Sequence, residues 1–173
     1  QYLRLLQLPV VELRSAIESR CVEIAPEAGF QVRRHVYYLG QWINHGGWYP
    51  DWRVRVVRRG RARWGGTDPH DKLIPEGPVG SLSADIHHYT YQNFSHQIRT
   101  INHFSDVVVE EWTTQGMRFS LLKALFHPPV KFIECYLWKL GFLDGWAGFV
   151  IAVASAFYVF TKYVKRWEHE QRK

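Results

Sequence analysis

The feature that most constrains this chain is an apolar, uncharged run near its end, Trp146–Thr161, with cations on both sides. The run has about 16 residues, or roughly 24 Å as a helix, whereas a hydrocarbon core of about 30 Å takes roughly 20 residues to cross. Lys131 and Lys139 precede the run, and Lys162 and Lys165 follow it. A spanning helix usually has an asymmetric charge distribution. Length and charge therefore favour helices that lie in a membrane interface.

Aromatic residues support an interfacial tail. Val130–Leu140 has the apolar spacing of an amphipathic helix, and aromatic residues recur from there to the end. Rings of this kind settle at the level of lipid headgroups, where neighbouring cations meet anionic lipid. The residues expected at the interface are Trp138, Trp146, Tyr158, Tyr163 and Trp167. Two alternatives stay open: a helix buried in the core or in an oligomer, and a true membrane span.

The whole chain has the composition of a folded domain with a basic surface. Its 173 residues are 46% hydrophobic, which is enough for one domain with a core. The net charge of +6 suggests a polyanionic partner such as nucleic acid, anionic lipid or a phosphorylated substrate. Cys21 and Cys135 lack metal-ligand spacing and predict reduced, buried thiols. Since the chain begins at Gln1 without a signal peptide, we expect it to be part of a longer polypeptide.

Periodicity predicts a mixed α/β domain before the tail. Helices are expected at Pro9–Arg20 and Phe94–Gly116, the second capped by Asn93 or Ser95. Alternation of apolar and polar residues predicts strands at Ala28–Leu39, Arg53–Arg59 and Val79–Leu82. Segments rich in glycine, tryptophan or proline predict loops at Gln41–Asp51 and Gly65–Gly80. Pro128 and Pro129 punctuate the chain. We therefore expect one domain at 1–127 and a helical tail at 128–173.

Three polar clusters are candidates for chemistry. Asp71 beside His70 has the character of a general base, although the pair would equally shape a turn. His45–Asp51 forms a second, glycine-rich cluster. A third cluster combines His87 and His88 with His96, Arg99 and His103, but its spacing is not specific for zinc. Phosphate-loop, dinucleotide and nucleophile-elbow motifs are absent from the sequence.

The order of these motifs resembles family 2 glycosyltransferases of the lipopolysaccharide-core type. The resemblance covers about residues 10 to 165, and its pieces are specific only as an ordered set. The matching pieces are Tyr38–Ile43, His45–Asp51, Arg55–Arg59, Trp64–Gly66, His70–Asp71, Gly77–Leu82, His88–Tyr91, Lys131–Phe132, Gly141–Gly145 and Lys162–Tyr163.

The resemblance implies a partial GT-A fold, in which a mixed sheet packs with helices. It also implies inverting transfer of a sugar from a nucleotide-sugar donor to a lipid-linked or lipopolysaccharide-core acceptor. Asp71, which stands where many relatives have Glu, would take the proton of the acceptor hydroxyl, with His70 beside it. His88 matches a position near the metal and diphosphate, and would be a metal ligand. The expected substrate-binding or diphosphate-binding residues are His88, Arg55, Arg58, Asp51, Trp48 and Arg99.

The family's donor-binding half would precede this chain, which contains no Asp-x-Asp motif. A divalent metal, Mg²⁺ or Mn²⁺, is expected mainly from that half, and this chain alone is not expected to turn over. The expected location is peripheral, on the cytoplasmic face of the bacterial inner membrane, with anionic lipid and no nucleic acid as partner. A homo-oligomer, or a non-catalytic scaffold that kept the acceptor surface, stays an alternative.

Overall fold

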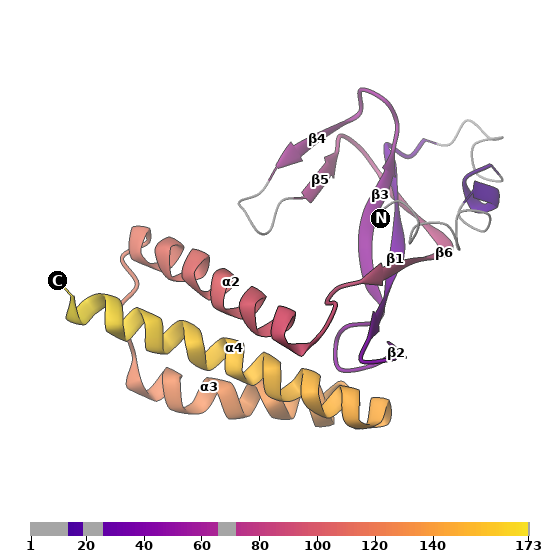
Figure 1. The fold of residues 1–173 in the computed structure, drawn as a ribbon. Coiled ribbons are helices and arrows are strands. Elements are labelled where there is room, and N and C mark those ends of the chain that lie inside the picture. Colours follow the sequence, from indigo (N-terminus) through magenta and orange to yellow (C-terminus); the bar gives the residue numbers. More distant parts are fainter. Residues whose placement is uncertain (1–13, 19–25, 66–71, 173) are drawn as a thin grey trace. The chain divides into compact units, whose positions relative to one another are not determined.

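The computed structural model describes residues 14–18, 26–65 and 72–172, and its contacts divide the chain into two compact units. The sheet unit comprises Gln1–Tyr37 and Trp48–Tyr89, and the helical unit comprises Tyr38–Gly47 and Thr90–Lys173. Most strands thus lie in the sheet unit and the three long helices in the helical unit, and together they confirm the expected mixed α/β class (Figure 1). The boundary expected at residues 127 and 128 stays a prediction.

The sheet unit is built around β1 (Gly29–Tyr38). This strand pairs antiparallel with β3 (Asp51–Val57) and parallel with β6 (Val79–Tyr89). Alternating apolar residues of β1 form the core, since Phe30 and Val32 are buried against Leu82. Residues 14–18 are helical, as expected for that part of Pro9–Arg20, and Ala16 and Ile17 pack on the same core.

In the sheet unit, one predicted strand is longer than expected and one predicted loop contains a strand. The strand expected at Val79–Leu82 continues to Tyr89, because β6 pairs with β1 along most of its length. The predicted loop Gly65–Gly80 includes β5 (Lys72–Pro75), which pairs antiparallel with β4 (Ala62–Gly65). Neither short strand has the long alternation by which a strand is recognised in sequence.

The helical unit consists of three long helices, with α4 between α2 and α3 (Figure 1). α2 (Phe94–Thr114) begins at Asn93, whose side chain accepts a hydrogen bond from the His96 amide at 2.8 Å. This confirms one of the two expected caps. The unit also contains the short strand β2 (Gln41–Ile43), inside a segment predicted as a loop.

α3 (Leu121–Ile133) begins well before the prolines that were expected to interrupt the chain. Pro128 and Pro129 lie inside it, and Ser120 caps it by accepting a hydrogen bond from the Lys123 amide. A proline removes one helical hydrogen bond without ending every helix, and Pro128 is buried by packing. The helix continues into a π-helical turn, η2 (Glu134–Trp138), and then a 3₁₀ turn, η3 (Gly141–Asp144).

α4 (Gly145–Gln171) is longer than the uncharged run that predicted it. Its basic end stays helical because the cations find partners: Lys165 donates to Asp106 at 2.6 Å, and Arg166 donates to Thr113 at 2.7 Å. The helical stretch Gly141–Gln171 is long and apolar enough to cross a membrane by length and composition alone, with a third of its most apolar window buried.

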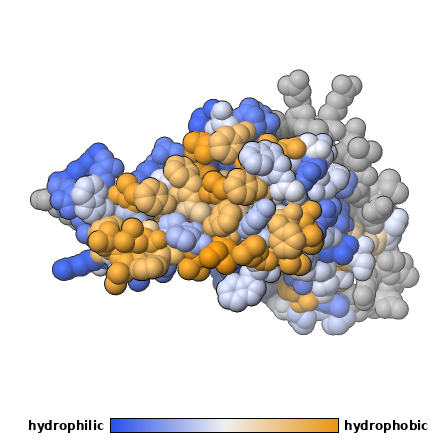
Figure 2. Space-filling model, turned by 90° about the horizontal axis from the view of Figure 1, so that it is seen from below, coloured by the Kyte–Doolittle hydropathy of each residue, from blue (hydrophilic) through white to orange (hydrophobic). Residues whose placement is uncertain are grey.

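The exposed surface of α3 and α4 is unusually apolar. Figure 2 shows these side chains gathered over the helical unit, seen from the α3 side. Trp138 and Trp146 are the most exposed, at 80% and 73%, and Trp167 is also exposed. Tyr158 is half-buried, whereas Tyr163 is buried. The expectation for Tyr163 at the interface is therefore corrected, because its hydroxyl contacts His127 at 2.7 Å inside the unit.

We predict that Gly148→Ala destabilises the helical unit. A Cβ atom at this position would lie 1.8 Å from the carbonyl oxygen of Gly141, where the start of α4 crosses η3. Because the backbone of Gly141 or of α4 would have to move to relieve this overlap, the free energy of unfolding should fall by about 3 kcal/mol or more. Urea titration followed by circular dichroism measures the loss. The half-buried Ser155→Ala on the same helix should change stability by less than about 1 kcal/mol; equal effects would contradict the close approach.

Candidate functional site

A cluster of charged side chains lies where β1, β3 and β6 run side by side. The register pairs Arg34 with Asp51 and Val36 with His88. Arg34 donates from Nη2 to Oδ2 of Asp51 at 2.5 Å, and Nε of Arg53 lies 2.9 Å from Oδ1 of the same carboxylate. Three strands distant in sequence thus bring two predicted residues, Asp51 and His88, into one neighbourhood.

The electrostatics of this cluster keep His88 neutral. Burial lowers the pKa of its imidazole, and the guanidinium groups of Arg34 and Arg55 lower it further, while Asp51 opposes them. A neutral imidazole beside guanidinium groups can accept a hydrogen bond, and guanidinium groups suit phosphate oxygens. Asp51 and Arg55 thus both act on the His88 imidazole, while the substrate-binding roles expected of these residues stay predictions.

A second cluster in the sheet unit is centred on Asp85. Its carboxylate accepts from Arg33 at 2.6 Å and from the Tyr49 hydroxyl at 3.0 Å, and His35 lies 3.8 Å away. The Arg33 guanidinium also lies 5.9 Å from the centre of the Tyr49 ring and 5.8 Å from that of Trp52. Burial and the Asp85 carboxylate raise the pKa of Tyr49.

Sequence reasoning missed this second cluster. Arg33 and His35 alternate with the buried Val32 and Val36 in β1, and polar residues at alternate positions of a half-buried strand are a usable signal. Asp85 gave no such signal, because the strand that holds it was expected to end at Leu82. The parallel pairing of β6 with β1 sets Asp85 opposite Arg33.

The other predicted residues are distributed more widely. His70 and Asp71 lie outside the described residues; their described neighbours Gly65 and Lys72 pair in register. Arg58 is exposed directly after β3, and its amide donates to the Ala28 carbonyl oxygen at 3.0 Å. Trp48 is half-buried in the sheet unit, and Arg99 is exposed on α2 of the helical unit.

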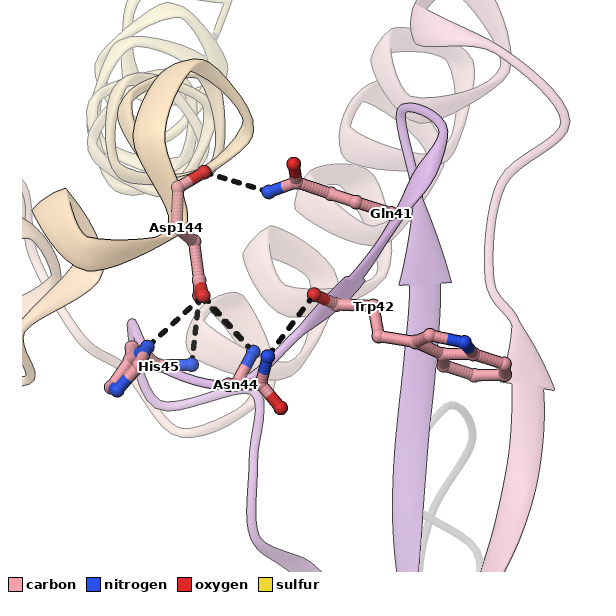
Figure 3. A network of polar contacts seen from close by, with 5 residues as sticks. All are labelled: Gln41, Trp42, Asn44, His45 and Asp144. Carbon is pink, nitrogen blue, oxygen red and sulfur yellow. Dashed lines mark hydrogen bonds and ion pairs between the residues drawn. The ribbon is translucent and has the colours of Figure 1, made fainter.

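A buried carboxylate organises the helical unit (Figure 3). The Asp144 side chain is only 4% exposed; it accepts from the amides of Asn44 at 3.2 Å and His45 at 2.8 Å. Its Oδ1 lies 3.0 Å from Nδ1 of His45, and its backbone carbonyl accepts from the Gln41 side chain at 2.7 Å. This contact joins residues about a hundred positions apart, and nothing in the sequence predicts it.

The described residues do not fit a metal centre. No group of three or more histidine, cysteine, aspartate or glutamate side chains among them could hold a metal ion. His88 has arginines for neighbours, and their charge would repel a divalent cation.

Comparison with curated proteins finds the lipopolysaccharide core biosynthesis glycosyltransferase LpsC of Rhizobium meliloti (strain 1021). The alignment is 26% identical over 151 residues and covers 84% of this chain. The chain is a homologue of that glycosyltransferase. It spans about half the length of this relative, 54%, in the relative's C-terminal part. No family model and no solved structure matches. The predicted resemblance to a glycosyltransferase of lipopolysaccharide core biosynthesis is confirmed, while family 2 and the GT-A fold stay predictions.

We predict that Arg55→Gln raises the pKa of His88, because it removes a positive charge that disfavours the imidazolium. Histidine titration by NMR measures it, and the exposed Arg59→Gln is the matched control, expected to have a smaller effect. In the parent chain the folded state binds this proton less readily than the unfolded state. His88 therefore lowers stability as pH falls below about 6.5 towards its folded pKa. An unchanged pKa in Arg55→Gln would contradict the cluster.

Proposed function

We propose that this chain is the acceptor side of an inverting family 2 glycosyltransferase. The complete enzyme would move a sugar from a nucleotide-sugar donor to a lipid-linked or lipopolysaccharide-core acceptor. The observation that carries the proposal is the similarity to the C-terminal part of LpsC, a glycosyltransferase of lipopolysaccharide core biosynthesis by name. Because the alignment leaves the rest of LpsC unmatched, we assign donor binding, and any Mg²⁺ or Mn²⁺, to sequence outside this chain.

Inverting transfer needs one base and a way to stabilise the leaving group. We assign the base to Asp71, with His70 beside it. Its carboxylate takes the proton of the acceptor hydroxyl as that oxygen bonds to the anomeric carbon, and the bond from this carbon to the diphosphate breaks. Negative charge then builds on the departing nucleoside diphosphate and requires fixed positive charge nearby.

The cluster around His88 suits that second task. Arg34 and Arg55 supply positive charge beside a neutral imidazole, which would accept a hydrogen bond from the substrate. We assign Arg58, also exposed near the end of β3, to the same phosphate surface, with Trp48 as a platform for a sugar ring. Asp51 has a different role, since its ion pairs with Arg34 and Arg53 hold two of the guanidinium groups in place.

The helical unit would attach the enzyme to the cytoplasmic face of the inner membrane. Exposed apolar residues on α3 include Leu122, Leu125 and Phe126, and Trp138 and Trp146 follow on either side of η3. So large an apolar surface on a soluble monomer marks an interaction site. Exposed tryptophan beside cations is the composition of a membrane interface.

A non-catalytic membrane scaffold is the second candidate. The specific observation in its favour is the large exposed apolar surface of α3 and α4, which belongs to the helical unit, whereas His88 belongs to the sheet unit. Such a protein would bind lipid vesicles and would have no transferase activity in its complete form. Assays of the complete polypeptide therefore distinguish the two functions.

We predict that Asp71→Asn in the complete polypeptide abolishes sugar transfer and leaves donor binding unchanged. An amide cannot take the hydroxyl proton, and loss of a general base costs about 10²-fold to 10⁴-fold in rate. Transfer is measured with a radiolabelled nucleotide sugar and a lipid-linked acceptor, and donor binding by calorimetry. The isolated 173-residue chain provides the blank, since it should not turn over. Asp68→Asn, a nearby carboxylate in the same segment, is the control, and full activity of Asp71→Asn would remove Asp71 from the mechanism.

We predict that the double change Trp138→Ser with Trp146→Ser reduces flotation with vesicles of anionic lipid. The two rings are 80% and 73% exposed, so their loss removes membrane contact with little effect on packing. Trp64→Ser is the control, because this ring is 68% exposed but belongs to the sheet unit. Equal flotation of all three proteins would contradict docking by the helical unit. DNA retention at matched salt tests the expectation that nucleic acid is not a partner.

A further inference from the structure

A groove opens between α2 and α4, entirely within the helical unit. Its volume is about 420 Å³, within the range of about 300 to 1,000 Å³ that is usual for small-molecule sites. Apolar side chains form much of the wall, and a few polar groups accompany them. The lining residues are Ile98, Arg99, Ile101, Asn102, Phe157 and Thr161.

Arg99 is a cation without a partner beside this groove. Among the described residues, no carboxylate forms an ion pair with its guanidinium, whereas most other cations of the helical unit are paired. Those pairs are Lys131 and Lys139 with Glu134, Lys165 with Asp106, Arg166 with Glu170, and Arg172 with Glu168. A guanidinium offers five donors and binds phosphate or carboxylate in a bidentate manner. Its charge is therefore available to an anion from outside the unit.

The apolar wall of the groove continues onto the outer surface of α4. Phe157 lines the groove and is nevertheless 44% exposed. It also belongs to a stripe of exposed apolar residues that recur every three or four positions on this helix: Val153, Phe157, Phe160, Val164 and Trp167. A hydrocarbon chain that reached this stripe from a bilayer could enter the groove without leaving apolar surroundings.

We propose that the groove binds the hydrocarbon chain of a phosphorylated lipid, with its phosphate held by Arg99. An apolar slot beside one unpaired cation is complementary to an amphiphile with an anionic head. The Asn102 side chain adds an amide to the polar rim, whereas the Thr161 hydroxyl already donates to the Phe157 carbonyl oxygen at 2.8 Å. The lipid we propose is the phosphorylated anchor of the acceptor, as distinct from the phospholipids of the bilayer, and this assignment rests on the proposed function.

Calorimetry with monododecyl phosphate below its micellar concentration tests the site on the 173-residue chain. We expect saturable binding, much weaker binding of inorganic phosphate, and about tenfold or greater loss of affinity in Arg99→Gln. Dodecyl maltoside, which has the same chain and no charge, should bind weakly and equally to both proteins. Phe157→Ser should also weaken dodecyl phosphate binding. Arg118→Gln and Phe126→Ser, exposed changes outside both the groove and the stripe on α4, should not.

Four results would overturn the proposal. Binding of dodecyl maltoside as tight as that of dodecyl phosphate would mean a detergent patch, and binding of inorganic phosphate as tight as that of dodecyl phosphate would mean a simple anion site. Displacement by dihexanoyl phosphatidylglycerol as effective as by dodecyl phosphate would assign the groove to bulk membrane lipid. Transfer by the complete polypeptide to an acceptor with and without its lipid anchor separates this inference from the proposed function. If the anchor has no effect, the lipid site fails while the glycosyltransferase stands.

Discussion

The helical unit depends on the hydrogen bonds of a buried carboxylate, that of Asp144. A charge removed from water is costly unless it is hydrogen-bonded, and here two backbone amides and an imidazole approach it (Figure 3). The contact fixes the segment Gln41–Gly47 against the turn between α3 and α4. Trp138 and Trp146 lie close to Asp144 in sequence, on either side of η3.

The sheet unit also pairs charged side chains from different strands, and its cations are arginines. Its strands hold Arg33 and Arg34 at adjacent positions of β1, so the two side chains serve different clusters. Each has a carboxylate partner from another strand, Asp85 on β6 and Asp51 on β3. Such pairing holds guanidinium groups at defined positions while leaving donors for a ligand. Arg55 is exposed near His88 and forms no ion pair with a carboxylate of the described residues, which agrees with the phosphate contact that we propose for it.

Local sequence patterns predicted the elements better than their contacts. The helical spacing of apolar residues in α2, its Asn93 cap and the alternation of β1 each depend on neighbouring residues of the sequence, and all three were predicted. Pro128 and Pro129 were expected to interrupt the chain, but both lie inside α3, where Pro128 is buried. Whether a proline ends a helix depends on the packing around it, which the dipeptide alone does not contain. The strand predicted at Val79–Leu82 was too short, because the later residues of β6 are mostly polar and are held in the strand by pairing with β1. Asp144 and the groove beside Arg99 join distant segments, so no window of sequence contains the information.

The same contacts bear on how the apolar helix meets a bilayer. By length and composition α4 could span one, yet its second half packs along α2 through polar groups. Lys165 reaches Asp106, Arg166 reaches Thr113, and the Lys162 amine lies 5.5 Å from the centre of the Trp112 ring. Crossing the membrane would draw these charges, and the acidic residues of α2, into hydrocarbon at several kcal/mol each, about 2.5 to 3.5 by insertion scales. An interfacial position leaves them hydrated and still places the apolar faces of α3 and α4 against lipid, so the helix packing itself favours docking over crossing.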